Sequence, residues 1–192
     1  MLIVICGKSG AGKSEASSYI IENYDIEKVK TTTTRPKRKD NPNDEIDYNF
    51  VSDLGFFDME DDLTLIKCYN TVHGKWWYGV QKSDFNDIEE RDKIILLDPK
   101  GVEELQEILP KNNYVVIEIC CWSEIRKQRT LARNDNRAEV ERRLIADEED
   151  FKNLVADIHI SNETNDINIL YDSIDLVLEK KIGIRKVADC IE

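Results

Sequence analysis

Residues Leu2–Ser14 read LIVICGKSGAGKS and join an apolar segment directly to a glycine-rich one. Residues 2–6 form a continuous apolar run that is β-branched in its middle, as is typical of a strand buried on both faces of a parallel sheet. Residues 7–14 match G-x-x-x-x-G-K-[ST] at every fixed position. A helix is expected from there to about Tyr24. This order of strand, glycine loop and helix predicts a phosphate-binding loop.

The residue types in this loop suit a nucleoside triphosphate. Glycines allow close backbone approach, and the loop N–H groups and the helix N-terminus then face the phosphates. Lys13 is expected to act catalytically by reaching the β- and γ-phosphates, and the Ser14 hydroxyl to ligate Mg²⁺ that arrives with ATP. The candidate ATP-binding residues in the loop are Ser9, Gly10, Ala11, Gly12, Lys13 and Ser14.

Positive charge is unevenly distributed along an acidic chain. The 192 residues include 27 basic and 39 acidic ones, a net charge of −12, which argues against a nucleic-acid partner. Residues 28–39 and 126–143 nevertheless carry six and seven of the basic residues. Two basic islands on an acidic body suit a small polyanion better than a duplex.

Other compositional features narrow the class of protein. No apolar run approaches the roughly 20 residues that cross a bilayer, so no membrane partner is expected. The start of the chain does not resemble a signal peptide. Five cysteines fit neither zinc spacing nor a disulfide framework, and with two histidines and no clustered ligands a permanent metal site is not expected. We expect a cytoplasmic protein.

Buried-type strands alternate with helices along most of the chain. Further strands are expected at 93–98, 114–121 and 158–160, and helices at 99–109, 123–134, 138–155 and 167–181. Residues 31–47 are expected to be a loop, followed by a strand at 46–51, a short helix capped by Ser52 and a hairpin over 63–80. The pattern predicts one α/β domain over residues 1–192, a P-loop NTPase-type parallel sheet flanked by helices. Its core is assigned to 1–30, 81–125 and 155–192, with a small β-rich insertion at 31–80 and a helical lid at 126–154.

The second basic island favours a small-molecule kinase among P-loop proteins. A GTPase switch would need an Asn-Lys-x-Asp motif, which the sequence lacks. The acceptor is expected to be anionic and held by Arg35 and Arg38. Because phosphoryl transfer depends on positioning and charge neutralisation, arginines around the transferred group would do most of the catalytic work. The candidates are Arg129, Arg133 and Arg143.

These motifs together resemble those of the guanylate kinase family of nucleoside monophosphate kinases. TTRPKR at 33–38 is similar to the family's T-T-R-x-x-R, whose arginines grip the monophosphate, and DYNFV at 47–51 to its D-Y-x-F-V, whose tyrosine contacts the same phosphate. Residues 129–133 and 143–144 resemble the segments that carry the family's lid arginines. Asn162 resembles the family's asparagine near the adenine of ATP. The resemblance implies that the insertion binds the acceptor nucleotide. The acceptor contacts that it implies are Thr31, Arg35, Arg38, Tyr48, Lys67, Tyr78, Val80 and Asp98.

The chain departs from the family where the base is read. The family commonly reads guanine with a glutamate, a serine and an aspartate. At the corresponding positions this chain has Lys67, Val80 and Asp98, so only the aspartate is kept. One interpretation is that Lys67 faces the base and favours one that offers hydrogen-bond acceptors, such as a pyrimidine. The other is that Lys67 points to solvent and Glu60, Asp61 or Asp62 supplies the acid. Asp98 is expected to orient Mg²⁺ through water or to contact the acceptor.

The resemblance implies an ATP- and Mg²⁺-dependent nucleoside monophosphate kinase, with GMP or dGMP as the first hypothesis for the acceptor. One alternative is a kinase of another acceptor, a pyrimidine or modified deoxynucleotide or a sugar phosphate. A second alternative is a catalytically silent guanylate-kinase-like module that binds proteins. The intact Lys13-Ser14 pair and both arginine sets argue against the silent module.

Overall fold

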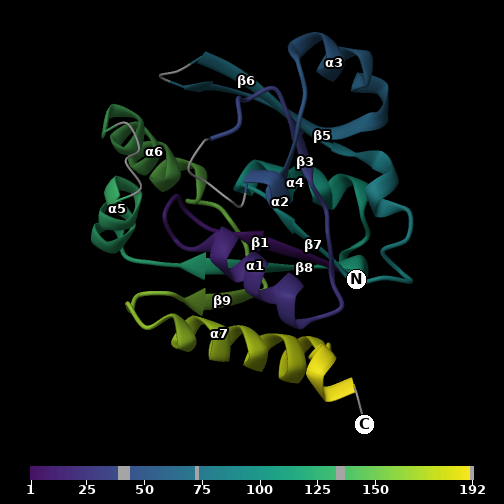
Figure 1. The fold of residues 1–192 in the computed structure, drawn as a ribbon, viewed down its shortest axis with the longest axis vertical. Coiled ribbons are helices and arrows are strands. Elements are labelled where there is room, and N and C mark those ends of the chain that lie inside the picture. The colour runs from purple at the N-terminus through teal and green to yellow at the C-terminus, as the bar shows by residue number, and fades with distance from the viewer. Residues whose placement is uncertain (39–43, 72–73, 133–136, 191–192) are drawn as a thin grey trace.

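A computed structural model describes residues 1–38, 44–71, 74–132 and 137–190 (Figure 1). In these residues a five-stranded sheet has the order β2-β7-β1-β8-β9, and all four pairings between its strands are parallel. The central strand β1 is at most 1% exposed at every position, because both faces of the sheet are covered. The predicted α/β fold is confirmed. The strands are β1 (Leu2–Cys6), β2 (Glu27–Lys28), β7 (Lys93–Leu96), β8 (Tyr114–Cys120) and β9 (Ile158–Ser161).

Alternate residues of β1 point into two separate cores. Ile3 and Ile5 pack with the helices on one face, α1 (Lys13–Asn23) and α7 (Ile167–Asp175), which continues as a π-helix over Leu176–Ile182. Leu2 and Val4 pack on the other face, with α4 (Pro99–Ile108). The period-2 alternation of a strand therefore divides one apolar run between two helical layers.

A second sheet lies beyond the first and has the order β4-β3-β6-β5 (Figure 1). Its strand β3 pairs parallel with β4 and antiparallel with β6. The prediction of a loop from Thr31 to Asp47 was therefore wrong at both ends. At the start, β-branched threonines form a strand between two strands that are distant in sequence, and at the end the chain forms a short helix. The elements of this region are β3 (Thr31–Thr33), α2 (Asp44–Asp47), β4 (Tyr48–Phe50), α3 (Asp53–Asp58), β5 (Leu63–Thr71) and β6 (Gly74–Gln81). The capping of α3 by Ser52 is confirmed, since its hydroxyl accepts from Gly55 N.

Two helices, α5 (Ser123–Ala132) and α6 (Arg137–Asp150), form the region predicted to be a lid. The sequence predicted helix to residue 155, but α6 ends at Asp150. Phe151 and Leu154 follow in a turn and pack against the core on the α4 side of the sheet. No helix in the described parts of the chain is long and apolar enough to cross a membrane.

The C-terminal segment is anchored to α1 by a polar cluster around Asp175. Its carboxylate accepts hydrogen bonds from Tyr19 Oη at 2.9 Å and Tyr24 Oη at 2.8 Å, and it pairs with Lys186. Burial raises the pKa of Asp175, but the hydrogen bonds from Lys186, Tyr24 and Tyr19 outweigh it and hold the pKa below its ordinary value. The ionised carboxylate thus stabilises the packing of α7 on α1.

Asp175→Asn should lower the free energy of unfolding by about 1.5–3 kcal/mol at neutral pH, the range for hydrogen bonds to a charged group. Because the pKa is depressed in the folded state, the contribution is present above the unfolded pKa of about 3.9 and is lost as the pH falls through the folded pKa. Urea unfolding at pH 7 and near pH 3 measures the difference, which should shrink at the lower pH. Asp172→Asn, on the exposed side of α7, is the control. An equal loss in both variants would contradict the anchoring role.

Candidate functional site

The glycine-rich loop between β1 and α1 has the backbone geometry of an anion cradle. Gly10 and Gly12 have φ angles of 79° and 104°, in the left-handed region that favours glycine. Lys13 Nζ donates to Gly7 O at 2.6 Å, so the ammonium lies over the loop that it is expected to serve. The sequence placed this loop correctly between strand and helix.

Asn162, predicted near the adenine of ATP, supports the loop from the end of β9. Its side chain is buried, and Nδ2 donates to Ala11 O at 2.8 Å. A Cβ atom added to Gly12 would lie 2.3 Å from Nδ2, so the close approach requires glycine. Beside this contact is a cavity of about 230 Å³. Its lining residues are Gly10, Gly12, Glu15, Arg129, Asn162, Thr164, Asn165 and Ile167.

The Ser14 hydroxyl, the predicted metal ligand, lies beside a carboxylate that sequence analysis gave no role. Ser14 Oγ is 3.3 Å from Asp47 Oδ2, and Asp47 Oδ1 is 3.0 Å from Lys28 Nζ. Burial lowers the pKa of Lys28, and Asp47 opposes that effect. A hydroxyl and a carboxylate are the hard oxygen donors that Mg²⁺ prefers, so the residues present fit that ion. The position of Asp47 in the DYNFV segment was the available signal.

The lid helices contact the loop directly. Asp147 Oδ2 accepts from Ser9 N at 2.7 Å, and Arg126 NH1 lies 3.2 Å from the same oxygen. Arg126 NH2 is 2.8 Å from Glu148 Oε1. The Asp147 side chain is 13% exposed, whereas the next three acidic residues, Glu148, Glu149 and Asp150, are exposed. Burial raises the pKa of Asp147, while the Ser9 N–H and the nearby cations oppose that rise. No sequence signal distinguished this carboxylate from its acidic neighbours.

On the acceptor side, Arg35 is held by charge and aromatic contacts. Its NH2 lies 3.0 Å from Oδ1 of the fully buried Asp44, and its guanidinium carbon lies 4.9 Å from the Tyr48 ring centroid. Burial raises the pKa of Tyr48 to about 12, so its hydroxyl stays a hydrogen-bond donor at neutral pH. Arg38 donates through its backbone N to Asp44 Oδ2 at 2.8 Å, and its side chain is exposed. Arg35 and Tyr48 are thus brought together, with Arg38 at their edge.

Lys67 does not point to solvent. Its side chain is 8% exposed, and Nζ lies 2.6 Å from Asp98 Oδ1. Tyr69 Oη bonds the other carboxylate oxygen, and Gly101 N donates to Oδ1 at 2.7 Å, so Asp98 also caps α4. The alternative in which Lys67 is solvated is wrong, and Glu60, Asp61 and Asp62 are themselves exposed.

An irregularity in β5 directs Lys67 toward Asp98. The pairing of β5 with β6 shifts between Thr64 and Lys67. Leu65, in this bulge, has a φ of 52°, the one positive φ angle of a non-glycine residue in the described ranges. Bulges re-aim side chains, and such backbone strain is found at functional sites.

The remaining acceptor candidates differ in accessibility. Tyr78 lies between two aromatic partners, with its ring centroid 5.5 Å from Tyr69 and 6.3 Å from Tyr48. Thr31 is half-buried on β3 and pairs with Tyr48 and Val80. Val80 is 1% exposed in the hydrophobic core, so the sequence placed it wrongly among residues that touch a ligand.

Arg129 and Arg143, two of the three arginines of the predicted lid, have different partners. Arg129 donates from NH1 to Asn162 O at 3.1 Å and from NH2 to Thr164 O at 2.8 Å, which places it in the wall of the ATP-side cavity. Arg143 Nε donates to Oε1 of the buried Glu139 at 2.8 Å. Arg133 lies outside the described residues.

The chain is similar to known proteins over most of its length. The family model described as guanylate kinase matches residues 1–181. A guanylate kinase of Helicobacter pylori (strain ATCC 700392 / 26695) is 31% identical over 147 residues, which cover 75% of this chain and 70% of that enzyme. The guanylate kinase of Tropheryma whipplei (strain Twist) is 25% identical over 171 residues, which cover 84% of this chain and 88% of that enzyme. The match to the Leifsonia xyli enzyme, 26% identical over 145 residues, spans 74% of this chain but only 57% of that enzyme.

A solved structure shares the fold. The guanylate kinase of Anaplasma phagocytophilum superposes with a TM-score of 0.65 at 20% sequence identity, covering 99% of this chain and 91% of its own.

Gly12→Ala should weaken ATP binding by on the order of tenfold or more, because the added Cβ collides with Asn162 Nδ2 and the φ of 104° is strained for any side chain. Isothermal titration with ATP measures the affinity. Gly55→Ala, whose added Cβ meets Ser52 Oγ at 3.3 Å outside the site, is the matched control. Unchanged ATP affinity in Gly12→Ala would show that the loop does not hold the nucleotide.

Proposed function

The chain belongs to the guanylate kinase family, and from this membership we infer that it is an ATP-dependent nucleoside monophosphate kinase. We propose that it phosphorylates GMP or dGMP, the acceptor class that the names of its relatives indicate. One observation carries the assignment of the two substrate sites. The consecutive residues Asp47 and Tyr48 contact Ser14 and Arg35, so the triphosphate loop and the acceptor arginine lie on either side of one dipeptide.

On the ATP side, we assign the phosphates to the glycine loop and Lys13. The cavity beside Gly10 and Gly12 would take the adenosine, with Asn162 and Arg129 in its wall. Arg129 therefore contacts the nucleoside side of ATP in this proposal, rather than the transferred phosphoryl group assigned to it from sequence. Arg143 and Arg133 stay as the lid arginines proposed to approach the phosphates.

On the acceptor side, we assign the monophosphate to Arg35, Arg38 and Tyr48. A guanidinium and a neutral phenol are donors that match phosphate oxygens, and charge-assisted bonds of this kind are the strong ones. The role of these residues is to hold the acceptor oxygen in line with the γ-phosphorus of ATP. Alignment of two bound reactants is itself a large part of the catalysis of phosphoryl transfer.

Mg²⁺ would be held by Ser14 Oγ, with Asp47 close enough to orient its water ligands. When bound with ATP, it neutralises charge on the β- and γ-phosphate oxygens. The chain's own contribution is to fix these donors: Lys28, through its ion pair and its 2.7 Å bond to Ser17, holds Asp47 against Ser14.

For base recognition, we propose that Lys67 and Asp98 act as a pair. The ammonium offers donors and the carboxylate offers acceptors, a combination that suits the adjacent O6 acceptor and N1–H donor of guanine. The pair is pre-oriented by the bulge in β5 and by the cap of α4. This role replaces the expectation that Asp98 orients Mg²⁺.

The same pair makes a pyrimidine nucleotide the second candidate acceptor. A uracil or thymine ring offers the neighbouring O4 acceptor and N3–H donor on a smaller frame. The observation that favours this candidate is the substitution itself, since Lys67 brings donors to a position where the family has a carboxylate.

We propose that the protein acts in a reducing cytoplasm. Cys6, Cys68, Cys120 and Cys121 are free thiols in the structure, as a reducing compartment would keep them. ATP and nucleoside monophosphates are also intracellular substrates.

Lys13→Met should reduce kcat by on the order of 100- to 1,000-fold or more while the fold is retained, because a charge that acts on the transition state is removed. A coupled ADP-release assay with Mg²⁺, ATP and GMP measures turnover, and circular dichroism checks the fold. Lys8→Met is the matched control, since Lys8 Nζ turns away from the loop to Glu148 Oε2 at 2.6 Å. Full activity of Lys13→Met would refute the proposed site.

Lys67→Met should raise the KM of the preferred acceptor by about 10- to 100-fold, corresponding to a lost charge-assisted contact of about 1.5–3 kcal/mol. The wild type is first profiled against ribo- and deoxynucleoside monophosphates, where turnover confined to GMP and dGMP supports the main proposal. Turnover confined to pyrimidine nucleotides would select the second candidate. Lys75→Met, an exposed lysine on β6, is the control. A variant that loses thermal stability but keeps its acceptor KM would show that Lys67 serves only Asp98.

A further inference from the structure

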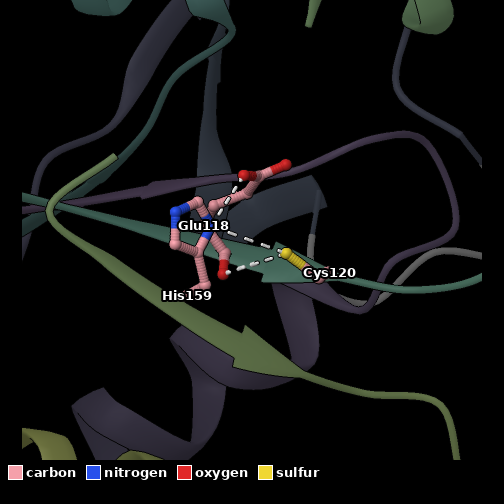
Figure 2. A group of neighbouring side chains, drawn as sticks. All are labelled: Glu118, Cys120 and His159. Atoms are coloured by element: carbon pink, nitrogen blue, oxygen red, sulfur yellow. Dashed lines mark hydrogen bonds and ion pairs between the residues drawn. The ribbon is translucent and has the colours of Figure 1, made fainter. Parts of the chain in front are cut away.

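Three side chains with metal-binding atoms meet at the border of β8 and β9, where sequence analysis expected no ligand cluster. Glu118, Cys120 and His159 contribute one ligand atom each, all within 4.8 Å of one another (Figure 2). His159 Nδ1 lies 3.0 Å from Glu118 Oε2 and 3.8 Å from Cys120 Sγ. The sequence concealed the cluster, because His159 is far from the other two along the chain.

The two strands impose this arrangement. Glu118 and Cys120 are two residues apart on β8, so their side chains leave the same face of the sheet. His159 is the registered neighbour of Glu118 on the parallel strand β9, which places its ring on that face as well. Because the backbones are fixed by the ladder, only the side-chain rotamers remain to be ordered when a metal binds.

The observed spacing is close to that of a zinc site. Zn–N and Zn–O bonds of about 2.0–2.1 Å and a Zn–S bond of about 2.3 Å give tetrahedral edges of about 3.3–3.6 Å. The nitrogen–oxygen and sulfur–nitrogen separations of 3.0 and 3.8 Å lie on either side of that range. The third pair, the Glu118 carboxylate and Cys120 Sγ, lies within 4.8 Å, so rotation of these side chains would close the site around an ion.

A cavity of about 240 Å³ adjoins the cluster and leaves room for a fourth ligand. Glu118 and Cys120 line it together with Glu163, Lys8 and Trp122. Glu163 adds negative charge, while the nearby ammonium of Lys8 is paired with Glu148. The cavity is separate from the one assigned to ATP, and the proposed kinase reaction uses none of the three ligands.

We propose that Glu118, Cys120 and His159 form a three-ligand Zn²⁺ site whose fourth position is open to water. Mixed sulfur, nitrogen and oxygen donors favour Zn²⁺ over the hard Mg²⁺ of the nucleotide site.

The site would brace the end of the sheet beneath the ATP-binding loop. Cys120 O accepts a hydrogen bond from Asn162 N at 2.8 Å, and Asn162 in turn supports the loop. A metal that ties β9 to β8 through side chains therefore holds the edge strand from which Asn162 follows. We expect it to raise the thermal stability of the protein rather than to take part in the reaction.

Co²⁺ titration of the reduced, metal-stripped protein without nucleotide tests the proposal, because Co²⁺ occupies zinc sites and reports on its ligands by absorption. One equivalent should produce thiolate-to-cobalt charge-transfer absorption and the visible bands of tetrahedral Co²⁺, and one equivalent of Zn²⁺ should abolish both. Zn²⁺ alone should also raise the melting temperature. Absence of the charge-transfer band would overturn the proposal.

Variants assign the ligands. Cys120→Ser should lose the charge-transfer band, and His159→Ala should weaken metal binding by on the order of 100-fold. The His159 side chain is 59% exposed, so the variant should melt like the wild type when metal is absent. Cys121→Ser is the matched control, since Cys121 lines the adjoining cavity but its Sγ contacts Arg129 NH1 at 3.6 Å and is not one of the three ligand atoms. A band that survives in Cys120→Ser, or that is lost in Cys121→Ser, would refute the assigned ligands.

Discussion

The hydrogen bond from the Asn162 side chain to Ala11 O is the contact on which the ATP side of the structure depends. It joins the end of the edge strand β9 to a loop that the lid helices also contact. Gly12 is required because a Cβ there would overlap the amide, and the cavity beside the loop shares Asn162 in its wall. Strand β9 is held in turn by its pairing with β8, so the accuracy of the loop derives from the register of the central sheet.

A second constraint links the two substrate sides. Asp47 and Tyr48 are consecutive residues at the junction of α2 and β4, and their side chains serve different neighbours. Asp47 contacts Ser14 and Lys28, whereas Tyr48 lies under Arg35. Movement of this dipeptide would displace both proposed anion sites at once. The small second sheet therefore does more than extend the fold: its strand β4 determines the spacing of donor and acceptor.

Local features of the sequence predicted most of the framework. The apolar runs, the loop from Gly7 to Ser14 and the Ser52 cap depend on residues that are close in the chain, and the structure confirms them. What the sequence missed depends on register and long-range pairing. Thr31–Thr33 becomes a strand only between β4 and β6, Lys67 finds Asp98 only through a bulge, and His159 meets Glu118 only across a ladder. Asp147 differs from neighbouring acids only in its burial, which composition cannot reveal.

Charge balance explains how a chain with a net charge of −12 can offer sites to nucleotides. Three buried cations each form an ion pair with a carboxylate. The pairs are Arg35 with Asp44, Lys28 with Asp47, and Arg126 with Asp147. Pairing offsets the cost of burying these cations and fixes their direction. Asp44 is fully buried and also binds Arg38 N, so two contacts hold it beside Arg35. In the proposed site, the phosphate would use the N–H donors of Arg35 that Asp44 leaves. An arginine has five N–H donors and a lysine has three, so arginine is better able to serve both anions.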